Sequence, residues 1–232
     1  MDGNSKLEKI LELLSEISNK YEAPCLSSSL SAEDMVITDL IATHKFPISV
    51  FCIDTGRLHH QTYELMQRVK ENYSLDITVY SPEADDLESY INTKGPNAFY
   101  QSVDYRKLCC HIRKVIPLGR ALKGKSLWLT GLRKQQSSTR TELSVFDWDE
   151  NFKIEKCNPL LDWAEDEVWD YIHAKSVPYN KLHDQGYPSI GCEPCTRAIK
   201  PSEDVRAGRW WWESPESKEC GLHAKGKVGV AS

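Results

Sequence analysis

The chain has 232 residues, 40% of them hydrophobic, which is enough to bury a substantial core in one domain or in one domain with an appendage. Its formal net charge of -5 and pI near 5.8 argue against a broad nucleic-acid-binding surface, so we expect its basic clusters to act on a small anion. No apolar run approaches the roughly 20 residues of a membrane span, and the charged N-terminal stretch lacks a signal-peptide core. We therefore expect a cytoplasmic protein with neither a nucleic acid nor a membrane as its partner.

Apolar periodicity predicts the first elements in chain order. Leucine and isoleucine recur at helical spacing between residues 6 and 20, which predicts an amphipathic helix ahead of the main domain. Three strand–helix pairs follow, each a short apolar run and then a helical pattern. We expect strands at 23–26, 48–52 and 77–80, and helices at 32–44, 59–72 and 84–93. This alternation predicts a parallel sheet.

The pattern continues with a long helix at 104–122 and a buried strand at 126–130. Together these elements predict an α/β fold with a doubly wound, mostly parallel sheet. Two strand-like segments between residues 144 and 157 and a helix at 164–175 come next, and regularity fades after Ser176. We divide the chain into an N-terminal helix (1–22), a nucleotide-binding α/β domain (23–213) and a mobile C-terminal tail (214–232).

The loops after the parallel strands carry polar residues. Such loops meet in one crevice at the carboxyl ends of the strands, where ligands bind. The loop at 27–33 is rich in serine and precedes a helix, so its backbone N–H groups and the helix dipole can hold a phosphate. A serine-rich turn at this place is more often only a helix cap. The loops at 54–58 and 131–140 face the same crevice, and the second carries Arg133, Lys134 and Arg140.

Two further cations lie near the end of the predicted domain. Arg206 and Arg209 precede and flank three consecutive tryptophans, residues that are typical of packing, so only the arginines indicate ligand contact. The cations of both regions together imply a compact polyanion as the ligand.

The cysteines indicate a metal site rather than disulfides, because the chain has eight of them at uneven spacing and no export signal. Cys192 and Cys195 form a C-x-x-C pair, which alone admits zinc, an iron–sulfur cluster or a redox disulfide. Cys109 and Cys110 supply two more thiolates, and four is the number that a cubane [4Fe-4S] cluster requires. Zinc also accepts four thiolates.

Basic residues surround the adjacent cysteines at 109 and 110. Four thiolates on a dicationic core leave a dianion, and Lys107, Arg113 and Lys114 would favour the ionised ligands. The alternative is that both cysteines are ordinary small core residues on a helix with a solvated basic face.

One cysteine stands alone near the end of the chain. Cys220 has His223 and Lys218 nearby, and both would favour its nucleophilic thiolate form. An incidental exposed thiol is the alternative. We expect the three cysteines in apolar, strand-like settings to be inert: Cys25, Cys52 and Cys157.

Four motifs in order make the chain resemble the assimilatory adenylyl-sulfate (APS) reductases. They are Cys109-Cys110-x-x-Arg113-Lys114, Cys192-x-x-Cys195-Thr196-Arg197, Arg206-x-Gly208-Arg209-Trp210-Trp211-Trp212-Glu213 and Glu219-Cys220-Gly221-Leu222-His223. The resemblance extends from about Ala23 to His223. It implies an adenine-nucleotide α-hydrolase-like fold, a [4Fe-4S] cluster on the four paired cysteines, and reduction of APS to sulfite and AMP with thioredoxin or a glutaredoxin as reductant.

The resemblance also assigns roles to residues. It makes Cys220 the nucleophile that forms an S-sulfocysteine, from which a second thiol frees sulfite. A lone cysteine reaches the disulfide state only with an external thiol, so a dithiol partner is expected. The catalytic residues are then Cys220, His223 and Lys114, and the metal ligands are Cys109, Cys110, Cys192 and Cys195. The substrate-binding residues are Ser28, Ser29, Ser31, Asp54, Thr55, Gly56, Arg57, Arg140, Arg206 and Arg209.

Three other functions compete with this one. A 3'-phosphoadenylyl-sulfate (PAPS) reductase, or an enzyme that accepts both nucleotides, would use the same scaffold. An ATP-pyrophosphatase of related fold carries a glycine-rich loop, whereas residues 29–34 contain no glycine. A non-enzymatic zinc-binding module with the tail as a docking peptide would be colourless rather than brown. The sequence leaves the oligomeric state open, a homo-oligomer included.

Overall fold

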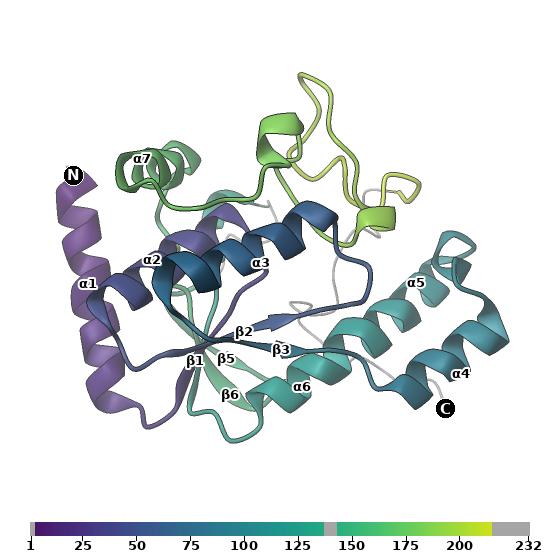
Figure 1. The fold of residues 1–232 in the computed structure, drawn as a ribbon, viewed down its shortest axis with the longest axis horizontal. Helices are drawn as coiled ribbons and strands as arrows, with labels where there is room; N and C mark the ends of the chain where they lie inside the picture. Colours follow the sequence, from purple (N-terminus) through teal and green to yellow (C-terminus); the bar gives the residue numbers. More distant parts are fainter. Residues whose placement is uncertain (1–2, 137–142, 215–232) are drawn as a thin grey trace.

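The structure, a computed structural model, describes residues 3–136 and 143–214 (Figure 1). Its six strands form one sheet in the order β3-β2-β1-β4-β6-β5, parallel except for β5. This confirms the predicted doubly wound, mostly parallel α/β fold. The strands are β1 (Pro24–Ser27), β2 (Ser49–Ile53), β3 (Ile77–Tyr80), β4 (Leu127–Leu129), β5 (Phe146–Asp149) and β6 (Ile154–Cys157).

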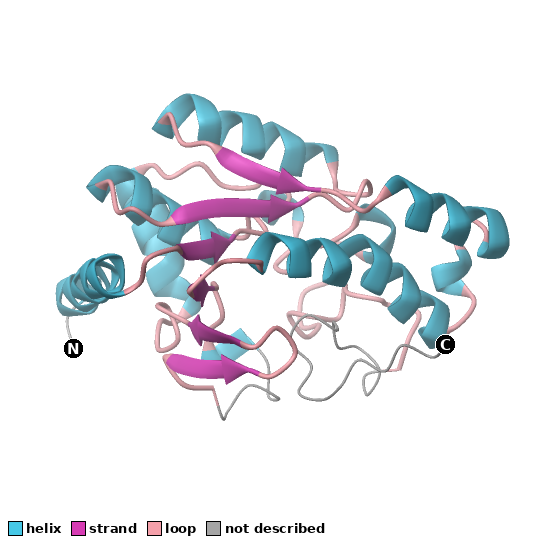
Figure 2. Ribbon diagram, turned by 90° about the horizontal axis from the view of Figure 1, so that it is seen from below, coloured by secondary structure: helices cyan, strands magenta, loops and turns pink. Residues whose placement is uncertain are grey.

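Helices cover both faces of this sheet (Figures 1 and 2). The predicted helices between residues 6 and 93 and the one at 164–175 are confirmed to within a few residues at each end. They are α1 (Gly3–Lys20), α2 (Ala32–His44), α3 (His60–Tyr73), α4 (Ala84–Lys94), α5 (Val103–Cys110), α6 (Ile116–Leu122) and α7 (Glu165–Lys175).

Alternation along the central strands divides the core in two. Side chains of a strand point to opposite faces in turn, and in β1 Leu26 joins one packed cluster while Cys25 joins the other. The cluster with Leu26 includes residues of α1, α2, α3 and α7. The cluster with Cys25 includes Leu118 of α6 together with Phe51 and Trp128. The apolar runs are therefore buried on both faces, as parallel strands are.

The predicted continuous helix at 104–122 is wrong in one respect. A π-helical turn, His111–Val115, separates α5 from α6, and the N–H of Ile116 donates to the carbonyl of His111. Apolar periodicity over so few residues cannot separate a π turn from an α turn, because both keep one face of the helix inward. Such turns occur often at functional sites.

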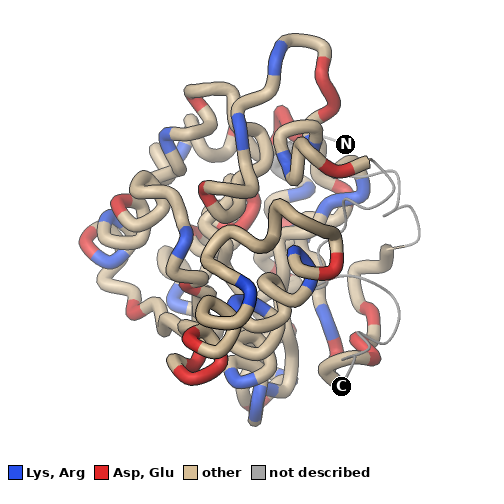
Figure 3. Tube along the Cα trace, turned by 90° about the vertical axis from the view of Figure 1, so that its right-hand side faces the viewer, with Lys and Arg blue, Asp and Glu red and all other residues tan. Residues whose placement is uncertain are grey.

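The chain after α7 forms an irregular segment, residues 176–214, which we call the C-terminal arm. Isolated bridges join Leu58 to Cys192 and Thr196 to Arg209, so the arm returns to the loop after β2 and then folds on itself. None of the described helices is long and apolar enough to cross a membrane. Lys and Arg are interspersed with Asp and Glu along the trace in Figure 3.

Candidate active site

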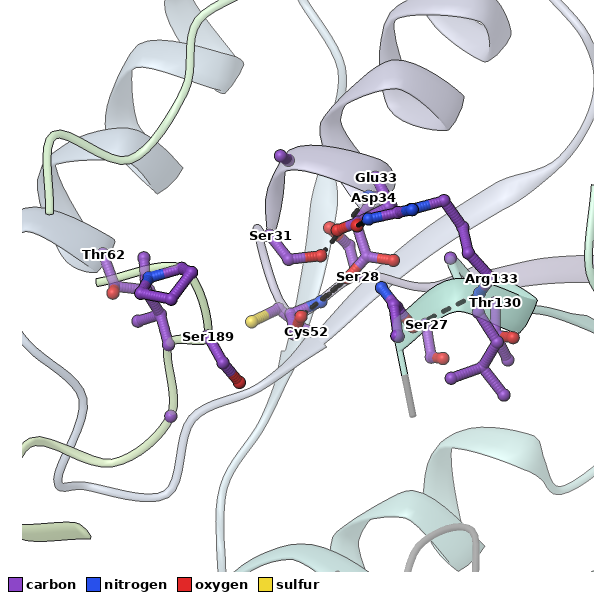
Figure 4. A pocket seen from close by; sticks show the side chains of 18 of the residues that line it. Ser27, Ser28, Ser31, Glu33, Asp34, Cys52, Thr62, Thr130, Arg133 and Ser189 are labelled. Atoms are coloured by element: carbon purple, nitrogen blue, oxygen red, sulfur yellow. Dashed lines mark hydrogen bonds and ion pairs between the residues drawn. The ribbon is translucent and has the colours of Figure 1, made fainter. Parts of the chain in front are cut away.

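A cavity of about 290 Å³ opens at the carboxyl ends of β1, β2 and β4. Ligand pockets typically enclose roughly 300–1,000 Å³, so this cavity suits a compact ligand. The loop after β1, the loop after β2, the loop after β4 and the C-terminal arm line it. Figure 4 shows Glu33, Asp34 and Arg133 on one side of the pocket and Ser189 of the arm on another.

The serine-rich loop after β1, residues 27–33, leads to the buried carboxylate of Asp34, at a place where the sequence predicts a bound anion. Ser31 caps α2, since its hydroxyl accepts a hydrogen bond from the Asp34 N–H. Asp34 Oδ2 accepts hydrogen bonds from the Ser29 N–H at 2.6 Å and the Ser29 hydroxyl at 2.7 Å. Burial raises the pKa of Asp34 to about 6, and these hydrogen bonds only partly offset that effect. The Ser29 N–H therefore already has an acceptor within the protein.

Arg133 is bound within the pocket wall. Its guanidinium donates to Glu33 Oε1 from Nε at 2.9 Å and pairs with it through Nη2 at 2.8 Å, and both side chains are largely buried. A Cβ on Gly131 would lie only 2.4 Å from Asp34 Oδ1, so glycine allows the loop after β4 to approach the start of α2. Lys134, which was expected in the crevice, instead pairs with Asp162 on the surface.

Seven of the residues predicted to be catalytic or to bind substrate line this cavity together. Three of the seven are cations: Lys114 comes from the π turn, and Arg206 and Arg209 come from the C-terminal arm. A Cβ on Gly191 would lie 2.4 Å from Arg209 Nη2, so this glycine leaves room for the guanidinium. The other four are Ser28, Ser29, Ser31 and Thr55.

Three residues predicted to bind substrate do not line the cavity. Asp54 Oδ1 closes a turn by accepting from the Gly56 N–H and the Tyr63 hydroxyl, both at 2.8 Å. Gly56 has φ +67°, a left-handed conformation that favours glycine. Arg57 turns to the cysteines, donates to Asn97 Oδ1 and lies 5.2 Å from the Phe99 ring centroid. The predicted residues outside the described part of the chain are Arg140, Cys220 and His223.

A second cavity brings together both cysteine pairs. The end of α5 carries one pair, and a short 3-10 turn, Glu193–Cys195, follows Cys192 directly and ends with Cys195. The Glu193 N–H donates to the Arg57 carbonyl, and the Trp210 N–H donates to the Cys195 carbonyl, so two loops hold the turn in place. The lining of this cavity includes four cysteines and four cations: Cys109, Cys110, Cys192, Cys195, Arg57, Arg106, Arg113 and Lys114.

This donor set fits an iron–sulfur cluster. Four thiolates bind a [4Fe-4S] core, and the surrounding cations offset the negative charge of the loaded site. Within residues 3–136 and 143–214, no three His, Cys, Asp or Glu side chains gather closely enough for a single metal ion. Four thiolates also suit a single zinc ion, so the donor set by itself admits either group.

The cysteines differ in their tendency to ionise. Burial opposes ionisation of Cys192, but Lys114, a contact with Thr55 and two arginines outweigh it and lower its pKa below the ordinary value. The Thr55 hydroxyl lies 3.2 Å from Cys192 Sγ. Burial raises the pKa of Cys195 to about 12 and also raises that of Cys109. Metal binding would therefore have to displace protons from these two thiols.

The remaining described cysteines have the inert character expected of them. Each is buried, and burial is the main cause that raises each thiol pKa to about 12. They are Cys25, Cys52 and Cys157.

A buried ion pair fixes the end of the C-terminal arm beside the cysteines. Arg106 Nε donates to Glu213 Oε1 at 2.9 Å and Nη2 donates to Oε2 at 2.8 Å, with side chains 1% and 3% exposed. The Arg106 guanidinium also lies 4.6 Å from the Trp210 ring centroid. Sequence reasoning missed this pair. The sequence offered one indication that Arg106 belongs to the site: it lies one helical turn before Cys109 on the same face of the helix.

Comparison with known proteins shows similarity to sulfonucleotide reductases. A model of the phosphoadenosine phosphosulfate reductase domain family matches residues 23–198. The adenosine 5'-phosphosulfate reductase of Allochromatium vinosum is 52% identical over 215 residues, which cover 93% of this chain and 84% of the relative. That of Burkholderia cepacia is 52% identical over 219 residues, covering 94% and 88%.

Solved structures show the same fold. A phosphoadenylyl-sulfate (PAPS) reductase from Candida auris, crystallised as a phosphate complex, has a TM-score of 0.71 at 30% identity, covering 82% of this chain and 90% of that chain. The FMN adenylyltransferase of Candida glabrata has a TM-score of 0.58 at 14% identity, covering 94% and 76%, which indicates the fold alone. The adenine-nucleotide α-hydrolase-like fold implied by the sequence is confirmed.

Proposed function

Because the chain belongs to the phosphoadenosine phosphosulfate reductase domain family, we propose that it reduces adenosine 5'-phosphosulfate to sulfite and AMP. Relatives about half identical to it over most of its length carry the name of that activity. One structural observation supports the proposal above the others: Lys114 lines both the cavity at the carboxyl ends of the strands and the four-cysteine cavity. One cation thereby serves the ligand and the metal site.

The cationic wall would hold the phosphosulfate group. Lys114, Arg206 and Arg209 lie on the wall of the pocket, and Arg140 is proposed as a further contact. Their charge would screen the substrate anion, so that a thiolate can approach its sulfur. Ser28, Ser31 and Thr55 provide further polar contacts for the nucleotide.

The chemical step would use Cys220, with His223 assigned to the site beside it. The Cys220 thiolate attacks the sulfur of the sulfate group, the bond from that sulfur to the bridging oxygen breaks, and AMP leaves with the electron pair. The product is an S-sulfocysteine. Cys220 follows Glu213 by seven residues, so an extended chain of roughly 25 Å bounds its reach from the Arg106–Glu213 ion pair.

A dithiol protein, thioredoxin or a glutaredoxin, would complete the reaction. Its first thiolate attacks Cys220 Sγ, which releases sulfite and leaves a mixed disulfide. Its second thiol resolves that disulfide and restores the Cys220 thiol. The two electrons that reduce sulfate to sulfite thus come from the dithiol, which becomes a disulfide. The reducing cytoplasm is the proposed location, where free thiols are maintained.

We also propose that Cys109, Cys110, Cys192 and Cys195 hold a [4Fe-4S] cluster. When bound, the cluster supplies a fixed local charge and a rigid connection between α5 and the C-terminal arm. The Lys114 ammonium group, which lines both cavities, would then stabilise negative charge on the substrate.

A second candidate substrate is PAPS. The similarity to the Candida auris PAPS reductase favours it, at 30% identity against about 50% for the relatives named for APS. Turnover measured with each nucleotide at equal concentration decides between them, and we expect APS to be preferred.

The decisive experiment is anaerobic purification followed by an APS assay with thioredoxin. We expect brown protein that contains iron and sulfide and forms sulfite. Cys220→Ser should keep colour and iron but lose turnover by roughly a thousandfold or more, as enzymes do without their nucleophile. Cys25→Ala, which removes a buried thiol from the core, should retain turnover. Sulfite formation by Cys220→Ser at the wild-type rate would contradict the mechanism, and colourless protein with one zinc would favour the zinc-binding module.

A further inference from the structure

Arg209 of the C-terminal arm is a buried cation without an acidic partner. The residue is 8% exposed, and none of the ion pairs within residues 3–136 and 143–214 includes it. Its Nη1 lies 3.4 Å from two neutral oxygens, Ser189 Oγ and the Ile190 carbonyl, and its Nε has no hydrogen-bond partner in this part of the chain. Such long contacts offset little of the cost of burying a charge.

The ring of Trp210 is the group that stabilises this cation. Arg209 Cζ lies 4.8 Å from the ring centroid, inside the roughly 6 Å range of a cation–π contact. Trp210 is 1% exposed, and such contacts are stronger where water is excluded. The ring therefore holds the guanidinium on the wall of the pocket that Arg209 lines.

Trp210 is itself fixed by the arm and by α5. Its φ of +41° is a left-handed conformation, which a bulky residue adopts only where its surroundings impose it. Its N–H donates to the Cys195 carbonyl at 3.1 Å, and its carbonyl accepts from the Glu213 N–H at 2.9 Å. The second cation on its ring, Arg106 at 4.6 Å, is neutralised by Glu213. The ring is thus a rigid support for Arg209.

We propose that the Trp210 ring positions the Arg209 guanidinium, so that the cation is in place before an anionic substrate group binds. The inference rests on the proposed function, in which Arg209 holds the phosphosulfate, and adds a residue that the sequence assigned to packing alone. A side chain ordered before binding loses less conformational freedom on binding, which increases affinity. Trp210 is a positioning residue, since it acts through Arg209.

The test is a double-mutant cycle for APS binding by the full chain, purified anaerobically with Cys220→Ser to prevent turnover. Calorimetric titration gives the dissociation constant for Trp210→Leu, Arg209→Gln and the double variant, and iron content is measured on each. Trp210→Leu should raise the dissociation constant of APS by about three- to tenfold. In the Arg209→Gln background the same change should have no further effect, because the ring then has no cation to position.

Trp211→Leu is the matched control. It removes the neighbouring tryptophan, which is 41% exposed and contacts the rings of Tyr100 and Trp212. Its dissociation constant for APS should equal that of the parent chain. An equal effect of Trp210→Leu with and without Arg209 would overturn the inference, because the ring would then act independently of the cation. Failure of the iron-loaded parent chain to bind APS would instead contradict the proposed function.

A second substitution covers the case in which Trp210→Leu loses iron or fails to fold. Tetrafluorotryptophan at position 210 nearly preserves the shape of the ring but removes most of the negative charge on its face, on which a cation–π contact depends. The dissociation constant of APS should rise, whereas the same replacement at position 211 should leave it unchanged. An unchanged or lower dissociation constant in the iron-replete protein fluorinated at position 210 would also overturn the inference.

Discussion

At the residue scale, two adjacent carboxylates at the start of α2 have different chemistry because their partners differ. Glu33 is paired with the Arg133 guanidinium. The Asp34 carboxylate accepts hydrogen bonds from the amide and hydroxyl groups of Ser29, and burial raises its pKa from an ordinary 3.8 to about 6. An ionised Asp34 therefore weakens the folded state near neutral pH.

The sign of this effect predicts the pH dependence of Asp34→Asn. Because the folded pKa is raised, the stability contribution of Asp34 is complete below about pH 3.8 and is lost as the pH rises through about 6. Asp34→Asn should therefore gain melting temperature relative to wild type between about pH 4.5 and 7.5. Two pKa units set an upper bound of roughly 3 kcal/mol.

Differential scanning calorimetry at one scan rate measures this difference. Asp76→Asn, whose side chain is 95% exposed, is the control and should show no such trend. A melting-temperature difference between Asp34→Asn and wild type that stays constant across the pH range would contradict the buried, weakly acidic state of Asp34.

At the element scale, α1 is part of the main core. Its residues Ile10, Leu14 and Ile17 belong to the packed cluster that contains β1 and α2. Lys6 also donates to Glu167 of α7 at 2.7 Å, so α1 contacts an element about 160 residues later in the chain. The periodicity of the sequence predicts the buried stripe of this helix, and the fold decides what the stripe packs against.

Leu14→Ala should lower the free energy of unfolding by about 2–5 kcal/mol, because it leaves a cavity at a fully buried position. Glu12→Ala, on the exposed face of the same helix, should change it by less than about 0.5 kcal/mol. Urea titrations followed by circular dichroism compare the two variants. Equal midpoints would show that α1 is not integral to the core.

At the scale of the whole molecule, the site is assembled from segments that are distant in sequence. The loop after β2, the end of α5 and the C-terminal arm meet around the two cysteine pairs. Arg106 and Glu213 connect the last two segments through a buried, bidentate ion pair. Replacement of either charge would leave the other uncompensated in a dry environment.

Glu213→Gln should therefore destabilise the protein by up to about 3–5 kcal/mol. Because the pair joins the segments that carry the two cysteine pairs, iron content should fall as well. Glu203→Gln breaks the more exposed Arg197–Glu203 pair within the same arm and should cost no more than about 1 kcal/mol. Melting temperature and iron content measured on both variants test the difference, and equal behaviour would refute a special role of Glu213.

Local patterns in the sequence predict most of the helices and strands and the residue types of the site. Helix and strand boundaries follow from local apolar periodicity, which each segment carries in its own residues. The paired cysteines at 109–110 and 192–195 and the cations near them are visible as motifs for the same reason. These local signals were sufficient to predict the succession of strands and helices along the chain and the thiolate character of the expected metal ligands.

Contacts between distant segments of the folded chain determine which of those residues face which cavity. Arg57 turns to the cysteines, Arg133 pairs with Glu33, and Lys114 lines both cavities. The π turn that carries Lys114 cannot be recognised from the spacing of apolar residues in the sequence. These positions depend on burial and charge pairing between segments that are distant in sequence. Such contacts exist only once the sheet and the C-terminal arm have brought the segments together.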